Sequence, residues 1–278
     1  MKLAQMIAAH EGLARTAATD RTGGSSSLIT LLRAVGETPR PGARILDLGC
    51  GAGLGVAALV ARGFDAHGFD IFEFWREHSQ WYWSEGGVGE CADRLIAGNE
   101  TPYRLPYPDA SFDYVISSEV LEHVDDRAGV FREVRRVLKP GGISAHIFPS
   151  RTKPLVEGHV GVPIAILCKW RPWLKAAAWL GLRTDRQAGM AWRDVLRTNS
   201  AQMEVTHYPS RATILGEARS AGFKARFAHR DYVAGSGTGW TRLKRRAGPI
   251  ADIAAVIALP HMLVLSHAAS IPPTEPAR

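Results

Sequence analysis

The stretch RILDLGCGAG, from Arg44 to Gly53, constrains the fold of this chain more than any other part of the sequence. It begins with the apolar residues Ile45 and Leu46, continues with a carboxylate at Asp47, and then sets three glycines ahead of a segment with helical periodicity. This order predicts a strand that passes through a glycine-rich turn into a helix. Because glycine has no Cβ atom, the backbone can turn tightly and approach a ligand, and the first N–H groups of the helix are unpaired. The stretch therefore predicts a site for a nucleoside or a nucleotide.

The composition is that of a globular protein, since 46% of the 278 residues are hydrophobic and the chain is long enough to bury a substantial core. No stretch reaches the roughly 18 consecutive apolar residues of a membrane-spanning helix. His10 and Glu11 interrupt the apolar residues near the start, so we interpret residues 1–12 as a helix of a cytoplasmic protein. The cysteines have no CxxC or His-paired spacing, so we expect neither a disulfide framework nor a metal site.

Charge is unevenly distributed along the chain. Residues 1–150 contain 15 Lys and Arg against 19 Asp and Glu, a net charge of −4, while residues 151–278 contain 19 against 8, a net charge of +11. The basic C-terminal half can attract an anionic substrate, a nucleic acid or an acidic membrane surface. It can equally be an ordinary solvated face, because net charge bears on association and not on fold.

Strand and helix patterns alternate from Arg44 onward. Strands are predicted from Arg44, over Phe64–Phe69, Leu95–Gly98, Tyr114–Ser117, Ile143–Phe148, Phe223–His229 and Met262–Leu265. Helices are predicted from the glycine turn to Gly63, over Arg127–Leu138 and over Tyr208–Gly222. The segment Lys139–Gly142 is expected to terminate the second of these. Short turns between alternating strands and helices predict a parallel sheet that is covered on both faces.

Four regions are expected. Residues 1–43 form an N-terminal helical cap with a flexible polar joint at Thr22–Ser27. Residues 44–149 and 209–266 form the sheet domain, residues 150–208 an insertion that governs substrate choice, and residues 267–278 a disordered tail. The insertion contains Val162–Leu182, in which three tryptophans alternate with Lys and Arg. This pattern suits a membrane interface or a lid over an amphipathic substrate, and equally a buried helical cap.

Asp70 closes the second predicted strand about 20 residues after the glycine turn, where a carboxylate can accept hydrogen bonds from ribose hydroxyls. The alternative is a helix N-cap or a loop carboxylate.

Four blocks occur in an order that resembles the class I S-adenosylmethionine-dependent methyltransferases, most closely those with a small-molecule-methyltransferase core. They are ILDLGCGAG, the acidic strand end at Asp70, LPYPDASFD followed by EVLEHV, and VLKPGG. The motifs match those of the family in detail from Ala43 to Phe148. The helix and strand predicted from Ser210 to His229 fit the later part of the family's fold. It implies an α/β, Rossmann-like, seven-stranded and mostly parallel sheet with helices on both faces, a helical insertion or lid after strand 5, and a last strand that pairs antiparallel.

The resemblance also implies the residues that bind S-adenosylmethionine, whose product is S-adenosylhomocysteine. Asp70 would bind both ribose hydroxyls and Ile71 would lie against the adenine. The adenine amino group would meet Asn99 or Glu100, although the following Thr101–Tyr103 stretch departs from the family pattern. The methionine part and the methyl group would be bound by Asp47, Gly49, Cys50, Gly51, Gly53, Ser118 and Glu119.

Methyl transfer from a sulfonium needs an in-line nucleophile and the exclusion of water, so positioning and desolvation do most of the work. A general base is required only for a hydroxyl acceptor, and histidine is the natural candidate near neutral pH. The candidates are His123, in the EVLEHV block, and His159, after the fifth strand. Either can instead be a structural histidine, since no partner fixes its role.

The leading prediction is an S-adenosylmethionine-dependent methyltransferase that methylates an oxygen of a small molecule, such as a sugar, a glycolipid or a secondary metabolite. The acceptor is expected to be anionic or amphipathic, with peripheral contact at the inner membrane face as an option. An RNA or protein methyltransferase is the second hypothesis, but the sequence contains no recognisable RNA-binding module and no NPPY-type tetrapeptide, so nucleic acid is not the expected partner. The third is a non-catalytic partner protein with a cofactor fold. The sequence leaves the oligomeric state open.

Overall fold

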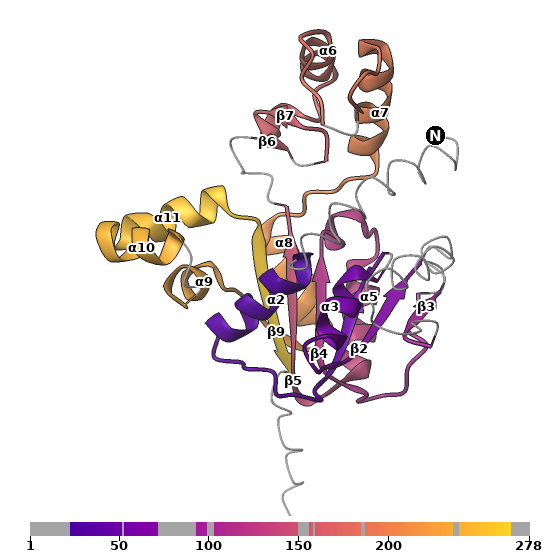
Figure 1. The fold of residues 1–278 in the computed structure, drawn as a ribbon, viewed down its shortest axis with the longest axis vertical. Helices are drawn as coiled ribbons and strands as arrows, with labels where there is room; N and C mark the ends of the chain where they lie inside the picture. The colour runs from indigo at the N-terminus through magenta and orange to yellow at the C-terminus, as the bar shows by residue number, and fades with distance from the viewer. Residues whose placement is uncertain are drawn as a thin grey trace, which may run out of the picture.

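A seven-stranded sheet forms the centre of the molecule (Figure 1). The computed structural model describes residues 23–51, 53–71, 93–98, 103–149, 156–157, 159–184, 187–235 and 239–267. The strands of the sheet are β1 (Arg44–Leu48), β2 (Asp65–Asp70), β3 (Leu95–Ala97), β4 (Phe112–Ser118), β5 (Leu138–Phe148), β8 (Phe223–Phe227) and β9 (His261–His267). Their order is β3-β2-β1-β4-β5-β9-β8; β9 runs antiparallel to β5 and β8, and the other pairs are parallel. The mostly parallel seven-stranded sheet predicted from the sequence is confirmed.

Strand β1 lies between β2 and β4 and is buried along most of its length. Ile45, Leu46 and Leu48 are at most 1% exposed. A central parallel strand is covered on both faces, which explains why its apolar residues run continuously and do not alternate with polar ones. Because β1, β2 and β4 are parallel, their carboxyl ends lie at the same edge of the sheet. The glycine turn and Asp70 both emerge at this edge.

Helices cover both faces of the sheet, as predicted (Figure 1). Two neighbouring residues of β4 show how the faces separate, because successive side chains of a strand point to opposite sides. Val115 belongs to the apolar cluster that contains Phe131, whereas Ile116 belongs to the cluster that contains Leu59. The described α-helices outside the insertion are α2 (Gly23–Ala34), α3 (Leu54–Val60), α5 (Arg127–Val137), α8 (Arg211–Ser220), α9 (His229–Gly235), α10 (Gly239–Ala247) and α11 (Pro249–Ala258); α10 and α11 pack against α9 and project away from the sheet (Figure 1).

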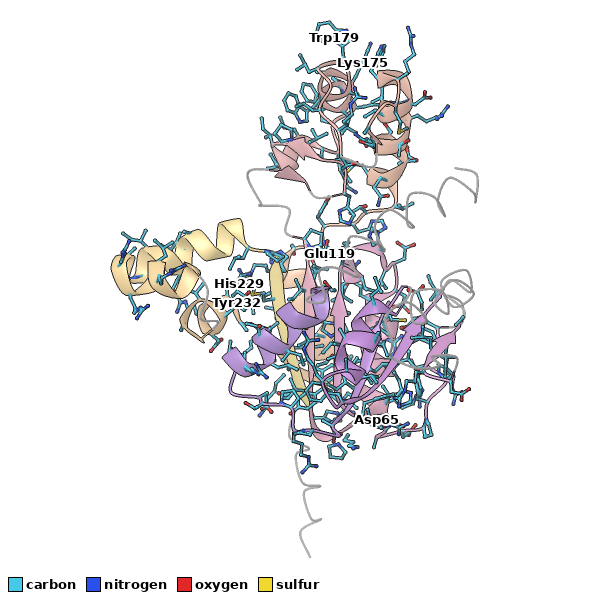
Figure 2. All side chains as sticks on the ribbon, in the orientation of Figure 1. Asp65, Glu119, Lys175, Trp179, His229 and Tyr232 are labelled. Carbon is cyan, nitrogen blue, oxygen red and sulfur yellow. The ribbon has the colours of Figure 1, made fainter. Side chains whose placement is uncertain are left out.

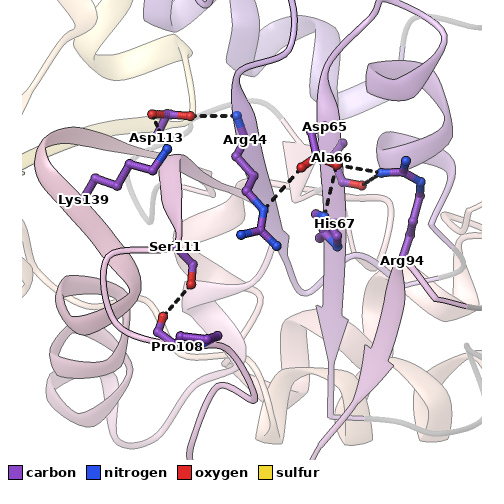
Figure 3. Close-up of polar contacts among 9 residues, drawn as sticks. All are labelled: Arg44, Asp65, Ala66, His67, Arg94, Pro108, Ser111, Asp113 and Lys139. Atoms are coloured by element: carbon purple, nitrogen blue, oxygen red, sulfur yellow. Dashed lines mark hydrogen bonds and ion pairs between the residues drawn. The ribbon is translucent and has the colours of Figure 1, made fainter.

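Ion pairs join the amino ends of the strands, at the edge of the sheet opposite to the glycine turn (Figure 3). Asp113 accepts hydrogen bonds from the Arg44 N–H and from Lys139 Nζ, each over 2.8 Å. Asp65 accepts one from Arg94 over 3.0 Å and lies 3.3 Å from Arg44 Nε. Burial acts to raise the pKa of Asp113, but the hydrogen bonds from Lys139 and Arg44 outweigh it and hold the pKa below its usual value. These contacts tie β1 to β2 and β4.

The chain between β5 and α8 leaves the sheet and forms an insertion that stands beyond the carboxyl end of β5 (Figure 1). Its elements are β6 (Val156–Glu157), β7 (Val162–Pro163), the 3₁₀ helix η2 (Ala165–Leu167), α6 (Arg171–Trp179) and α7 (Trp192–Glu204). It buries an apolar cluster of its own, separate from the two clusters of the sheet, formed by Val160, Val162, Cys168, Leu174, Ala177 and Met203. Within the described part of the chain, every helix is too short or too polar to cross a membrane.

The structure differs from the sequence predictions in three places. Helix α2 begins at Gly23, so residues 23–27 are helical and do not form the expected flexible joint. Strand β5 begins at Leu138, because Leu138 already pairs with Phe112 ahead of an irregularity in the register, so Lys139–Gly142 belongs to the strand. Helices α9, α10 and α11 lie between β8 and β9, where the sequence analysis predicted no helix. The expected first helix in residues 1–22 and the tail after His267 lie outside the described residues.

Candidate active site

The turn after β1 depends on glycine at defined positions. Gly49, Gly51 and Gly53 have φ angles of 70°, 53° and 78°, in the left-handed region that favours glycine. Gly49 is also sterically required, because a Cβ atom there would lie 2.3 Å from Cγ2 of Val120. At Gly51, by contrast, a Cβ would meet nothing within 4 Å. The turn therefore packs against the chain at Gly49 and faces open space at Gly51.

Asp70, at the end of β2, lies beside this turn. The Gly51 N–H donates a hydrogen bond to Asp70 Oδ2 over 2.9 Å, and the Gly49 N–H donates to the Phe69 carbonyl over 2.8 Å. Asp70 is the last residue of β2. The carboxylate is thus fixed at the edge where ligands bind in open α/β sheets.

Asp47 is buried near the end of β1, and Cys50 is partly buried in the turn that follows. Burial, and then the nearby carboxylate of Asp70, raise the pKa of Asp47 to about 7. Burial also raises the pKa of the Cys50 thiol, with Asp47 and Asp70 adding to the effect, so the thiol stays protonated. Its sulfur packs over Gly68, where a Cβ atom would lie 2.6 Å from Cys50 Sγ. Cys50 therefore packs against β2 at Gly68, where any residue with a Cβ atom would clash with its sulfur.

A cavity of about 510 Å³ opens at the carboxyl ends of β1, β2 and β4. Of the predicted site residues, Gly49, Gly51, Asp70, Ile71, Glu119 and His123 line it. Asp47, Cys50, Gly53, Ser118 and His159 do not, and Asn99 and Glu100 lie outside the described residues. The sequence analysis missed eight lining residues: Leu48, Phe69, Tyr103, Val120, Val124, Asp125, Asp126 and Val130. The EVLEHV block and the two aspartates after it were a signal for four of these, Val120, Val124, Asp125 and Asp126.

Glu119 follows β4 in an unusual backbone conformation. Its φ angle is 57°, which a residue with a side chain adopts rarely and which costs free energy that the surrounding structure must supply. The Glu119 N–H donates to the Ile147 carbonyl over 2.8 Å, which holds this conformation. As a result Val120 turns toward Gly49 and Glu119 borders the cavity. Figure 2 shows Glu119 at the junction between the sheet and the insertion.

The structure brings His123 and His159 together, although the sequence analysis treated them as separate candidates. Their ring centroids are 5.2 Å apart and the rings are nearly perpendicular. Both face the buried Glu122, whose Oε1 lies 3.6 Å from His159 Nε2 and 3.9 Å from His123 Nε2. Glu119 Oε2 lies 4.0 Å from His159 Nε2. The two histidines and two glutamates form a cluster at the edge of the cavity.

His146 shows what a structural histidine looks like in this protein. It is fully buried in β5, and its two ring nitrogens lie 2.7 Å from Ser117 Oγ and 2.8 Å from Ser144 Oγ. Burial lowers its pKa to about 3, so the ring is neutral. Both of its nitrogens are satisfied by hydroxyl groups, and His146 contributes no group to the cavity.

The sequence matches known proteins over the segment that builds this site. Residues 46–145 match a family model described as a methyltransferase domain. A sterol 24-C-methyltransferase from Gibberella zeae is 38% identical over 106 residues, 37% of this chain and 27% of the relative. A 27-O-demethylrifamycin SV methyltransferase from Amycolatopsis mediterranei is 38% identical over 40% of each chain, and a ubiquinone biosynthesis O-methyltransferase from Paracidovorax citrulli is 35% identical over 38% of this chain and 44% of the relative. The chain thus spans less than half the length of these curated relatives.

The fold is also that of a solved structure. A crystal structure of an S-adenosylmethionine-dependent methyltransferase from Mesorhizobium loti aligns over 89% of this chain and 100% of the other, with a TM-score of 0.53 and 21% identity. At that identity the likeness concerns the fold alone, and the matched family model adds the sequence blocks around the glycine turn. The chain therefore has the fold of an S-adenosylmethionine-dependent methyltransferase, and residues 46–145 match a methyltransferase domain.

Proposed function

We propose that this protein transfers the methyl group of S-adenosylmethionine to a hydroxyl group of a small molecule. The observation that supports this most is the cavity between the glycine turn and Asp70. The open space at Gly51 leaves room for the methionine part of the cofactor, and the Asp70 carboxylate, positioned by the Gly51 N–H, is the acceptor for the ribose hydroxyls. The contacts of Asp47, Gly49, Cys50, Gly53, Ile71 and Ser118 with the cofactor belong to the same proposal.

The charge of the cavity favours this cofactor over a dinucleotide. Among the described residues its lining contains Asp70, Glu119, Asp125 and Asp126, and no Lys or Arg. Such a cavity repels the phosphates of a dinucleotide and attracts the sulfonium and ammonium groups of S-adenosylmethionine. The raised pKa of Asp47 also favours a cationic cofactor, because a positive charge nearby would stabilise the charged form of this carboxyl group.

The acceptor is proposed to be a small molecule with a hydroxyl group. Two of the three curated relatives described above are named for O-methylation and one for methylation of a sterol carbon. The acidic cavity argues against a polyanionic acceptor such as RNA, since the backbone phosphates would have to approach four carboxylates. His123 and His159 are proposed to assist the loss of the hydroxyl proton.

The insertion is proposed to bind the acceptor and to contact a membrane surface. Trp170, Trp179 and Leu180 are 58%, 71% and 62% exposed, and the exposed Lys175 lies on the same helix as Trp179. Figure 2 shows Trp179 and Lys175 at the end of the insertion farthest from the sheet. Exposed indole rings among cations suit the interface of an anionic membrane, where an amphipathic acceptor would be available. A cytoplasmic location remains a prediction.

Calorimetric titration of the purified protein with S-adenosylmethionine tests the cofactor. Binding to the wild type and its loss in Asp70→Ala are expected; no binding to the wild type would contradict the proposed activity and support a non-catalytic partner protein. Incubation with isotopically labelled cofactor and separate small-molecule, RNA and protein fractions then tests the acceptor. Label in the small-molecule fraction is expected, and label only in RNA or protein would favour the second hypothesis.

A further inference from the structure

Among the described residues, neither oxygen of the Glu122 carboxyl group has a hydrogen-bond partner, although the side chain is completely buried. Glu122 lies in the 3₁₀ helix η1 (Leu121–His123), one turn beyond the end of β4. Buried polar groups are almost always hydrogen-bonded, and an exception calls for an explanation such as an ion. The ion pairs recorded for Glu122 among the described residues both go to imidazoles, which are neutral unless protonated.

The spacing of the groups around Glu122 is that of metal ligands. One atom each from Glu122, His123 and His159 lie within 4.8 Å of one another. Glu122 Oε1 is 3.6 Å from one histidine Nε2 and 3.9 Å from the other, which is too far for hydrogen bonds. Two ligand atoms at about 2.1 Å from a tetrahedral ion lie about 3.4 Å apart, so a small contraction would place all three around one cation.

His123 is held in the orientation and the tautomer that metal binding requires. Its Nδ1 lies 3.2 Å from the Val205 carbonyl oxygen. Because a carbonyl oxygen only accepts, this hydrogen bond requires the proton on Nδ1, and a neutral ring then has its lone pair on Nε2, the atom that faces Glu122. Metal-binding histidines commonly donate their other ring nitrogen to a backbone carbonyl in this way.

Glu119 is a fourth candidate ligand, and it connects the group of Glu122, His123 and His159 to the cavity. Its Oε2 lies 4.0 Å from His159 Nε2, and its left-handed backbone places it on the cavity wall together with His123. Two carboxylates and two neutral imidazoles have a net negative charge that a divalent cation would neutralise. Imidazole and carboxylate ligands together suit Zn²⁺ and Mn²⁺, and catalytic sites of this kind keep a position open for substrate.

We propose that Glu122, His123 and His159, with Glu119 as a fourth ligand, bind a divalent transition-metal ion at the edge of the cavity. The chemical consequence rests on the proposed function. An acceptor hydroxyl that binds the ion as a fifth ligand has a lowered pKa, loses its proton to water and attacks the methyl carbon; the carbon–sulfur bond breaks and its electron pair stays on sulfur. His123 and His159 then assist deprotonation as ligands and not as general bases.

Titration of the chelator-treated full chain with Zn²⁺ and with Mn²⁺, by calorimetry and by the electron paramagnetic resonance of Mn²⁺, tests the site. One ion per chain is expected to bind to the wild type. Glu122→Gln and His159→Ala are expected to raise the dissociation constant by more than about 100-fold, since loss of a direct ligand exceeds the usual effect of an outer-shell partner. The matched control is His207→Gln. The His207 side chain lies 2.9 Å from Asp125 and is not one of the proposed ligands, so its loss should leave metal affinity unchanged.

Two measurements separate this proposal from the proposed function and from misfolding. Glu122→Gln should retain its affinity for S-adenosylmethionine, which shows that the sheet is folded, while the rise in melting temperature that the metal gives the wild type is absent. The metal site is overturned if neither ion binds the wild type, or if Glu122→Gln binds as tightly as the wild type. Absence of S-adenosylmethionine binding with intact metal binding would overturn the proposed function and leave the metal site standing.

Discussion

The Gly51 N–H donates a hydrogen bond to Asp70 Oδ2 over 2.9 Å, so the turn after β1 holds the carboxylate at the end of β2. The two groups that are proposed to contact opposite parts of S-adenosylmethionine are thereby placed relative to each other before the cofactor binds. Such preorganisation reduces the free-energy cost of ordering the site on binding.

Asp70→Ala is expected to weaken S-adenosylmethionine binding by more than about tenfold, because hydrogen bonds to a charged acceptor contribute about 1.5–3 kcal/mol each. Calorimetric titration measures the change. Asp194→Asn is the control, since Asp194 is a partly exposed carboxylate of α7 that pairs with Arg197 and does not line the cavity. Equal affinities of Asp70→Ala and the wild type would contradict the proposed ribose contact.

Gly51→Ala and Gly63→Ala form a matched pair at the glycine turn. Both positions have a positive φ angle and no atom within 4 Å of an added Cβ, so each substitution should cost about 1 kcal/mol in the free energy of unfolding through backbone strain alone. Only Gly51 lines the cavity, so only Gly51→Ala is expected to reduce cofactor affinity. Urea unfolding and calorimetry measure the two effects. The prediction is wrong if both variants bind the cofactor as the wild type does.

Gly49→Ala should be more damaging than either of these, because its Cβ would lie 2.3 Å from Cγ2 of Val120 in addition to the backbone strain. Overpacking of this kind costs about 1–3 kcal/mol beyond the strain. Val120→Ala in the same chain should recover part of the loss by removing the atom that clashes. A double variant that is no more stable than Gly49→Ala would show that the steric contact is not the cause.

His146 should contribute a fall in stability between about pH 6.5 and pH 3, whereas Asp47, whose pKa burial raises to about 7, contributes in the opposite direction above about pH 4. Burial lowers its folded pKa to about 3, below the ordinary value of 6.5, so the neutral form contributes stability that is present above pH 6.5 and lost as the pH falls. From about pH 7 to pH 5 the free energy of unfolding should decrease by about 2 kcal/mol through this residue. His229 and His261, whose pKa values burial lowers to about 4, act in the same direction.

Urea unfolding of the wild type and of His146→Gln at about pH 7 and pH 5 measures this effect. The free energy of unfolding should change less with pH in His146→Gln than in the wild type. Asp65 and Asp113 do not interfere, since their pKa values lie below 3.8 and they remain charged in this window. If the free energy of unfolding of His146→Gln depends on pH as strongly as that of the wild type, His146 is not the cause.

Trp170→Ala together with Trp179→Ala is expected to reduce sedimentation of the protein with anionic vesicles by at least about tenfold, because two exposed indole rings would no longer enter the interface. Ile253→Ser on α11 is the control, since Ile253 is 64% exposed on a different part of the molecule. Loss of vesicle binding in Ile253→Ser but not in the tryptophan variant would place the membrane contact on α11 instead.

The sequence was sufficient to predict the elements whose pattern is local. The glycine turn, the buried strand before it and the position of Asp70 follow from residue types at fixed spacing, and the structure brings these groups together as expected. The cluster of Glu122 with His159 was not predictable, because it joins η1 to a residue beyond β5 and depends on the course of the insertion. Helices α9 to α11 were missed because they are only 7, 9 and 10 residues long, so each spans too few turns for its pattern to stand out in the sequence.

The separate apolar cluster of the insertion, which includes Val160 and Met203, affects how this protein can diversify. Since that cluster shares no buried residue with the two clusters of the sheet, substitutions in it leave the packing around the glycine turn unchanged. Effects of substitutions in separate clusters on stability are expected to add independently. Relatives can therefore acquire new acceptor preferences by mutation between β5 and α8 while the part of the chain that binds the cofactor keeps its sequence.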